Sequence, residues 1–214
     1  MPVVLRLLLA TALTATAVGG GVVLFTDDDS GGEPAQATSA PLSSFDTSRL
    51  TVLRTGFCDG VADSAVEEAL GAAPDHDSSY ANGDRVRLTE KVRDRAHEHG
   101  CVWSTGGVTA AGWVFAPPVP RATAETLIRR ARGAKSCEAV PDAPAFGDPS
   151  VGLVCTGDRG VEVSFRGLFG DAWLVCGIRS PNVSAGQTLD DAVDRTGRWC
   201  VAVAKAASAL PTTE

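Results

Sequence analysis

The pattern of hydrophobic and polar positions divides this chain of 214 residues into three parts. Residues 7–25 carry no charge, and their run is close to the ~20 apolar residues that span a bilayer. Arg6 precedes the run and aspartates follow it, so the positive-inside tendency places the N-terminus in the cytoplasm. We therefore expect residues 1–25 to form a single transmembrane anchor in the cell membrane, with the C-terminal part outside the cytoplasm.

A cleaved signal peptide is the alternative for this stretch, and it exports the rest of the chain equally well. A signal peptide has an apolar core of about 7–15 residues followed closely by a small-x-small site. Here the run is longer, and the nearest such triplet (35–37) lies well beyond it, so the anchor is favoured. Residues 26–48 are rich in Asp, Gly, Ser, Thr and Pro, which predicts a flexible polar tether.

Three segments of residues 49–210 show the spacing of an amphipathic helix. The first runs from Cys58 to Gly71, a typical helix stop, and the second covers residues 122–133. The third starts at a capping box formed by Thr188 and Asp191. It carries Cys200 on its apolar stripe, so this cysteine should face the core.

Shorter segments alternate or run apolar as strands do. They are residues 101–103, 110–116, 152–156, 161–166 and 172–178, with weaker candidates at 50–54 and 85–88. Short glycine turns join neighbouring strands, so the sheet should be mainly antiparallel. This order predicts an α+β domain with about three helices packed on one face of the sheet. Each half also runs cysteine, loop, cysteine-bearing strand, partner strand and helix, a faint sign of duplication.

All six cysteines lie in the part that we expect to be exported: Cys58, Cys101, Cys137, Cys155, Cys176 and Cys200. An even number in an oxidising compartment predicts three disulfides, and no C-x-x-C motif indicates redox or zinc chemistry. Among the possible connectivities we favour Cys58–Cys101, Cys137–Cys155 and Cys176–Cys200. The first and third would staple helices to the sheet, and the second would close a proline-containing loop.

Charge and motifs limit the partners and cofactors that we expect. The net charge is −7 and no run of basic residues is present, so nucleic acid is not an expected partner. No glycine-rich phosphate loop is present, so we expect no nucleotide cofactor. Arginine outnumbers lysine and isoleucine is scarce, which is typical of a GC-rich bacterial genome.

The most metal-like feature is the run His97-Glu98-His99. On a strand, His97 and His99 would point the same way as Cys101, a ligand set that suits zinc. We nevertheless expect Cys101 to be oxidised and residues 91–100 to be a solvated loop, so no metal site is expected. Serine hydrolysis has no G-x-S-x-G motif, and nothing in the sequence places a serine beside His76, His97 or His99. We therefore expect no catalytic residues and no enzyme activity.

Two apolar loops are candidate binding rims. Leu168, Phe169 and Asp171 lie at the end of an expected hairpin, and residues 116–120 form a stiff proline-rich segment. The alternative is that these side chains fold back over the edge of the core.

The motif Cys58-Asp-Gly-Val-Ala, the Leu70-Gly71 helix end and the strand Cys101-Val-Trp103 resemble those of actinobacterial cell-envelope proteins of the DUF3558 type. They also resemble the extracellular sensor domain of PknH-like kinases. The resemblance implies an envelope location and transfers no catalytic residue. We expect a membrane-anchored extracytoplasmic binding, sensory or accessory module of a bacterial cell envelope. The alternatives are an envelope hydrolase with a His/carboxylate site, and a structural or inhibitory module that binds a partner protein.

Overall fold

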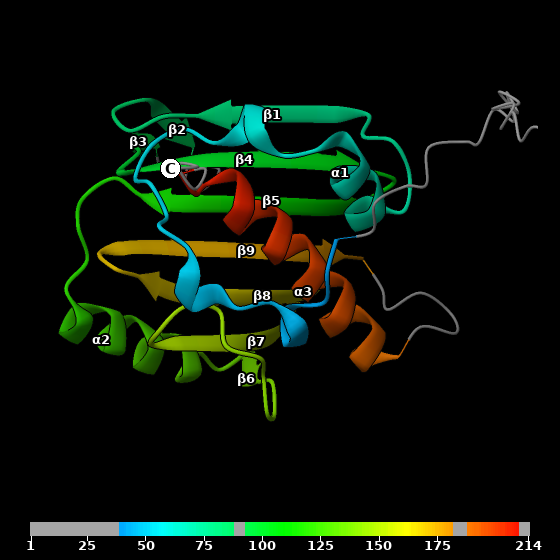
Figure 1. Cartoon of the computed structure of the whole chain (residues 1–214). Helices are drawn as coiled ribbons and strands as arrows, with labels where there is room; N and C mark the ends of the chain where they lie inside the picture. Colours follow the sequence, from blue (N-terminus) through cyan, green and yellow to red (C-terminus); the bar gives the residue numbers. More distant parts are fainter. Residues whose placement is uncertain (1–38, 88–92, 182–187, 210–214) are drawn as a thin grey trace, which may run out of the picture. The chain divides into compact units, whose positions relative to one another are not determined.

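The computed structural model describes residues 39–87, 93–181 and 188–209 (Figure 1). The expected anchor (1–25) and the tether up to residue 38 lie outside the described residues. Within the described part of the chain, no helix is long and apolar enough to cross a membrane.

The polar tether was predicted to extend to residue 48, but residues 39–48 pack on the domain. Leu42, in the 3-10 helix η1 (Leu42–Ser44), is 3% exposed. It lies against Gly197 of α3 (Leu189–Ala206), where an added Cβ would be only 3.1 Å from the Leu42 Cβ. A second 3-10 helix, η2 (Thr47–Arg49), follows. The boundary moves because Leu42 is a core side chain within a polar stretch.

The described residues form a seven-stranded sheet, whose neighbouring strands are all antiparallel, and a small separate hairpin. The sheet order is β1 (His76–Tyr80), β4 (Glu98–Thr105), β5 (Val108–Phe115), β9 (Ala172–Ser180), β8 (Gly160–Phe169), β7 (Ser150–Gly157) and β6 (Cys137–Ala139). The hairpin pairs β2 (Arg85–Arg87) with β3 (Arg93–Arg95). The α+β class and the antiparallel sheet are therefore confirmed. The weak strand expected at 50–54 is reduced to one bridge, between Val52 and Ser208.

The helices cover both faces of the sheet, so the prediction of one covered face is wrong. Side chains of β9 alternate between two apolar clusters. Leu174 and Cys176 belong to the cluster of α1 (Asp63–Leu70) and α3, whereas Trp173 and Val175 belong to that of α2 (Arg121–Arg132). A strand that is buried along its length needs cover on both sides. We call the two sides the α3 face and the α2 face.

Two of the expected helices keep their positions and one is shorter. The second and third expected helices correspond to α2 and α3, and the capping box of Thr188 and Asp191 is present. The first helix was expected from Cys58, but α1 begins at Asp63, and Cys58 lies in the separate 3-10 helix η3 (Cys58–Gly60). Gly71 ends α1 as predicted, with the positive φ of 81° that favours glycine.

The three favoured disulfides are confirmed: Cys58–Cys101, Cys137–Cys155 and Cys176–Cys200. The first joins η3 to β4, the third joins β9 to α3, and the second joins the paired strands β6 and β7. Two of the three crosslinks therefore connect the sheet to segments on its α3 face.

The duplication suggested by the sequence is seen in the order of the strands but not in the placement of the helices. The order β1-β4-β5 is mirrored by β7-β8-β9, with β5 and β9 adjacent and antiparallel at the centre. A two-fold axis between β5 and β9 would place the following helices, α2 and α3, on the same face. They lie on opposite faces, so the two halves are not related by such an axis.

Candidate functional site

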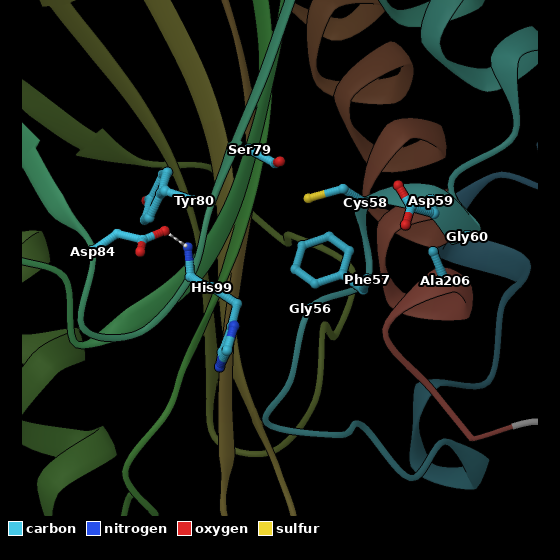
Figure 2. A pocket seen from close by; sticks show the side chains of 11 residues that line it. Gly56, Phe57, Cys58, Asp59, Gly60, Ser79, Tyr80, Asp84, His99 and Ala206 are labelled. Atoms are coloured by element: carbon cyan, nitrogen blue, oxygen red, sulfur yellow. Dashed lines mark hydrogen bonds between the residues drawn. The ribbon is translucent and has the colours of Figure 1, made fainter.

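A pocket of about 430 Å³ lies at the edge of the α3 face, between η3 and strands β1 and β4 (Figure 2). The residues that line it are Gly56, Phe57, Cys58, Asp59, Gly60, Ser79, Tyr80, Ala81, Asp84, His99 and Ala206. Figure 2 shows η3 and the end of α3 on one side and the strands with Ser79 and His99 on the other. Segments distant in the sequence therefore meet at this pocket.

The wall formed by η3 is held from three directions. The Cys58–Cys101 disulfide ties it to β4, next to the strand residue His99. The ring of Phe57 is 5% exposed and belongs to the core of the α3 face. A Cβ on Gly60 would lie 3.4 Å from the carbonyl oxygen of Ala206, so this turn rests on the C-terminal end of α3. The pocket is therefore largely preformed.

Two carboxylates and one imidazole supply the chemistry of the pocket. Asp59 comes from η3 and Asp84 from the turn after β1, and Figure 2 shows them on opposite sides of the pocket. One Asp84 oxygen accepts a hydrogen bond from the backbone N–H of Ala81 at 2.7 Å, which fixes this carboxylate in its turn. Ionised carboxylates only accept hydrogen bonds. The arrangement thus suits a ligand that brings ammonium or hydroxyl donors.

Tyr80 stabilises the strand edge beside the pocket. Its ring covers Gly100, where an added Cβ would lie 2.3 Å from the ring. Its hydroxyl donates to Glu98 Oε1 at 2.7 Å. Burial, and then the hydrogen bond to Glu98 and the charge of that residue, raise the pKa of Tyr80 far above its ordinary value. Tyr80 is therefore a neutral hydrogen-bond donor throughout the physiological range.

The structure separates the residues of the expected metal-like cluster. Cys101 is in a disulfide, and His97 precedes β4 and is exposed. His99 lies on the pocket side of β4, whereas Glu98 points to the other face and is bound by Tyr80. Among the described residues, no group of three His, Cys, Asp or Glu side chains is arranged to hold a metal ion. His76 lies on the exposed edge strand β1, where it pairs with Ser104, at the opposite end of β4 from His99.

The candidate binding loop is mostly part of the core. Leu168 is 4% exposed in the cluster of the α2 face, and Phe169 is 5% exposed in that of the α3 face. Only Asp171 is exposed, and it pairs with Arg54 at 3.3 Å. The backbone carbonyl of Asp171 accepts from the N–H of buried Val119, so the proline-rich segment 116–120 is attached to the same loop. The apolar side chains of both loops are thus folded back over the core.

Sequence reasoning missed Asp59 and Asp84 as site residues. Each is a single carboxylate in a polar turn, and the motif that contains Asp59 was taken only as a sign of resemblance, not as a site. The pairing of Cys58 with Cys101 was the available signal, because it brings Asp59 close to His99. Nothing in the sequence indicated Asp84, since β1 is a polar edge strand without an apolar pattern.

No family model matches the chain, and no curated protein matches its sequence. The resemblance to envelope proteins therefore stays a prediction, and the geometry of the pocket is the basis for a functional proposal.

Proposed function

We propose that the chain is an extracytoplasmic binding module of a bacterial cell envelope, anchored in the membrane by its N-terminal segment. The observation that carries the location is the set of three disulfides, which pair all six cysteines. Structural disulfides form and persist outside the reducing cytosol. Two of them link helical segments to the sheet, so the oxidised state is built into the fold.

The pocket beside His99 is the proposed binding site of this module. Asp59 and Asp84 offer carboxylate acceptors on opposite sides, and Phe57 offers an aromatic surface between them. Charge-assisted hydrogen bonds to an ammonium group are among the stronger polar interactions. We therefore expect a small ligand that bears an amine or several hydroxyls, such as an amino sugar or the free amine of a peptide.

The location is tested with the full chain expressed in a bacterium that has an oxidising envelope. We expect the chain to sediment with membranes and to resist alkaline extraction. A maleimide reagent should label none of the six cysteines before reduction and all of them afterwards. Recovery in the soluble cytosol, with free thiols, would contradict the proposal.

Ligand recognition is tested by titrating the full chain, in detergent micelles, with glucosamine and with glucose. The amine should make glucosamine bind more tightly than glucose, and Asp59→Asn should weaken glucosamine binding about tenfold, the effect of losing one charged partner. Asp75→Asn is a matched control, because this exposed aspartate does not line the pocket. Equal binding of both sugars by the two variants and the parent would sink this assignment.

A hydrolase remains the second candidate, because His99 and two carboxylates line the same pocket. In nucleophilic hydrolysis the base is hydrogen-bonded to the nucleophile and oriented by a third group. No such bond joins the side chains of His99 and Ser79 among the hydrogen bonds of the described residues. Turnover of an envelope glycan or peptide that His99→Ala abolishes, with an unchanged melting temperature, would establish the hydrolase in place of the binding module.

A further inference from the structure

Arg166 occupies an unusual position on the α2 face. It lies in the middle of β8, with Val151 of β7 and Val175 of β9 as its cross-strand partners. Both valines are buried members of the apolar cluster under α2, as is Leu168 two residues along the strand. The half-buried side chain of Arg166 therefore lies between apolar neighbours.

This guanidinium has no partner of its own. Its Nε is buried without a hydrogen bond, and no ion pair or hydrogen bond joins it to another described residue. The nearest carboxylate on the same strand face, Glu162, already accepts from Arg179 Nε at 3.0 Å and from Arg179 Nη2. Arg195 also has a buried Nε without a partner, but its Nη2 donates to Ser180 Oγ at 3.3 Å.

A second unpaired donor lies next to Arg166 on the same face. Ser164 is fully buried, and its Oγ has no hydrogen-bond partner. Its cross-strand neighbour on β9 is Gly177, which has no side chain to satisfy it. A buried polar group without a partner is costly, and more so if it is charged. Two such donors thus lie on the same face of β8, each without an acceptor among the described residues.

We propose that Ser164 and Arg166 form a binding site for an oxyanion, with the Arg166 Nε–H and the Ser164 hydroxyl donating to its oxygens. The planar guanidinium matches the geometry of carboxylate and phosphate groups, and no other side-chain type offers that fork. Arg179 and Glu162, the next pair along the strands, line an open pocket of about 480 Å³ together with Arg159. Ser164 and Arg166 lie beyond the lining of this pocket, so the anion has to pass Glu162 and Arg179 to reach them.

The charges of this face agree with an anionic ligand. Arg166 and Arg179 lie beside the carboxylate of Glu162, and the adjacent pocket adds Arg159 and Asp158, so the cations outnumber the carboxylates by one although the chain as a whole carries −7. Burial lowers the pKa of Arg166, and the charge of Glu162 opposes that effect in part. A bound anion would restore the balance of charge. The site lies on the opposite face from the His99 pocket and does not depend on the function proposed for it.

The test uses the full chain in detergent micelles, observed through the side-chain Nε–H resonances of its arginines. Inorganic phosphate and acetate are titrated separately against chloride at constant ionic strength. We expect a saturable shift of the Arg166 resonance with one or both anions. Phosphate alone would assign a phosphate-bearing ligand and acetate alone a carboxylate-bearing one, and either supports the site. No saturable shift with either anion overturns it.

Variants separate a binding role from a structural one. Arg166→Met should abolish the anion effect while leaving the melting temperature without anion unchanged or higher, because it removes an unpaired buried charge. Ser164→Ala should weaken anion binding about tenfold. Arg49→Met, at an exposed position of η2, is the matched control and should bind as the parent does. A lower melting temperature of Arg166→Met, or an anion shift that persists in Ser164→Ala at full strength, would contradict the proposal.

Discussion

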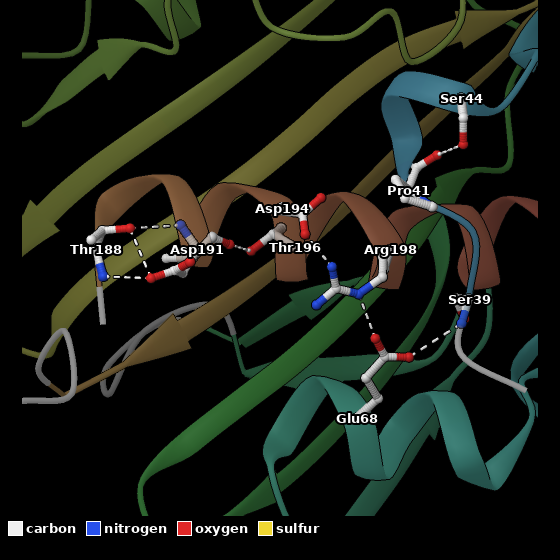
Figure 3. Close-up of polar contacts among 10 residues, drawn as sticks. Ser39, Pro41, Ser44, Glu68, Thr188, Asp191, Asp194, Thr196 and Arg198 are labelled. Atoms are coloured by element: carbon white, nitrogen blue, oxygen red, sulfur yellow. Dashed lines mark hydrogen bonds and ion pairs between the residues drawn. The ribbon is translucent and has the colours of Figure 1, made fainter. Parts of the chain in front are cut away.

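The two faces of the sheet are held together in different ways. On the α3 face, disulfides join η3 and α3 to the strands, and Trp199 of α3 meets Trp103 edge to face with 5.4 Å between ring centroids. Figure 3 shows how Arg198 of α3 binds Glu68 of α1 at 2.5 Å and also binds Asp194. The α2 face has one helix, and its disulfide joins two adjacent strands instead of joining that helix to the sheet.

This difference separates stability from recognition. Most of the specific crosslinks of the domain fix the α3 face, and the proposed pocket lies only at its margin. The α2 face keeps two donors without partners in its apolar cluster. Natural proteins commonly accept such local costs at functional sites, where the surrounding structure compensates for them. The crosslinked α3 face thus stabilises a domain whose α2 face retains unpaired hydrogen-bond donors.

The largest expected effect comes from the disulfides. Cys176–Cys200 and Cys137–Cys155 close segments of similar length, with sequence separations of 24 and 18, so the unfolded-chain entropy is nearly equal. The first pair is fully buried, whereas the second is half-buried. Replacing the first pair by alanines should cost about 4–5 kcal/mol, and the second about 3 kcal/mol. Urea unfolding measures both; a larger loss for the second pair would break the comparison.

Trp199 provides the next largest effect. Its indole N–H donates to the carbonyl of Ala111 at 3.0 Å, and its ring is 2% exposed. Trp199→Phe removes this donor, shortens a buried ring and loses the edge contact, so we expect a loss of about 2–3 kcal/mol. Ile128→Val, under α2, should cost about 1 kcal/mol. Equal losses in thermal unfolding would show that the two faces contribute alike.

Tyr80 is the only tyrosine of the chain, so tyrosinate absorbance at 295 nm reports on it alone. The pKa of Tyr80 is raised in the folded state. Its contribution to stability is therefore fully present below the unfolded pKa, near 10, and is lost as pH rises through the folded pKa. Tyr80 should stay protonated in the native chain at a pH where it is half-ionised in the urea-unfolded chain. Tyr80→Phe should cost about 1 kcal/mol, from the lost bond to Glu98. A native titration near pH 10 would refute the buried hydrogen bond.

The smallest expected effect concerns the capping box of α3. Thr188 donates to the Asp191 carboxylate from its backbone N–H and its hydroxyl, which lowers the pKa of Asp191 (Figure 3). Because the pKa of Asp191 is lower in the folded state, its ionised carboxylate stabilises the fold above the unfolded pKa, about 3.9. That stabilisation is lost as pH falls through the folded pKa. Asp191→Asn should therefore flatten the stability profile slightly below about pH 4. An unchanged acid limb would show that the box adds nothing in solution.

The sequence predicted the α3 face better than the α2 face. The capping box and the buried stripe through Cys200 located α3, and cysteines on buried faces led to the correct pairing. The one-face prediction failed because residues 172–178 read as a continuous apolar run, in which the alternation between two clusters is invisible. Strand β1 was missed because its side chains are polar and exposed.

The candidate sites were less accessible to sequence reasoning. Asp59, Asp84 and His99 meet only after η3 has been tied to β4, so their proximity depends on tertiary structure. Arg166 was seen as the polar half of an alternating strand. Its burial follows from the cover that α2 gives to the α2 face, which no local pattern reveals.

Native-state hydrogen exchange of the oxidised full chain tests the difference between the two faces most directly. We expect the amides of α3 around Trp199–Val203 to exchange only through global unfolding. Those of α2 around Ala124–Ile128 should exchange through a local opening that is about 2 kcal/mol or more less costly. Equal opening free energies for the two helices would contradict the account, because the α2 face would then be held as firmly as the α3 face.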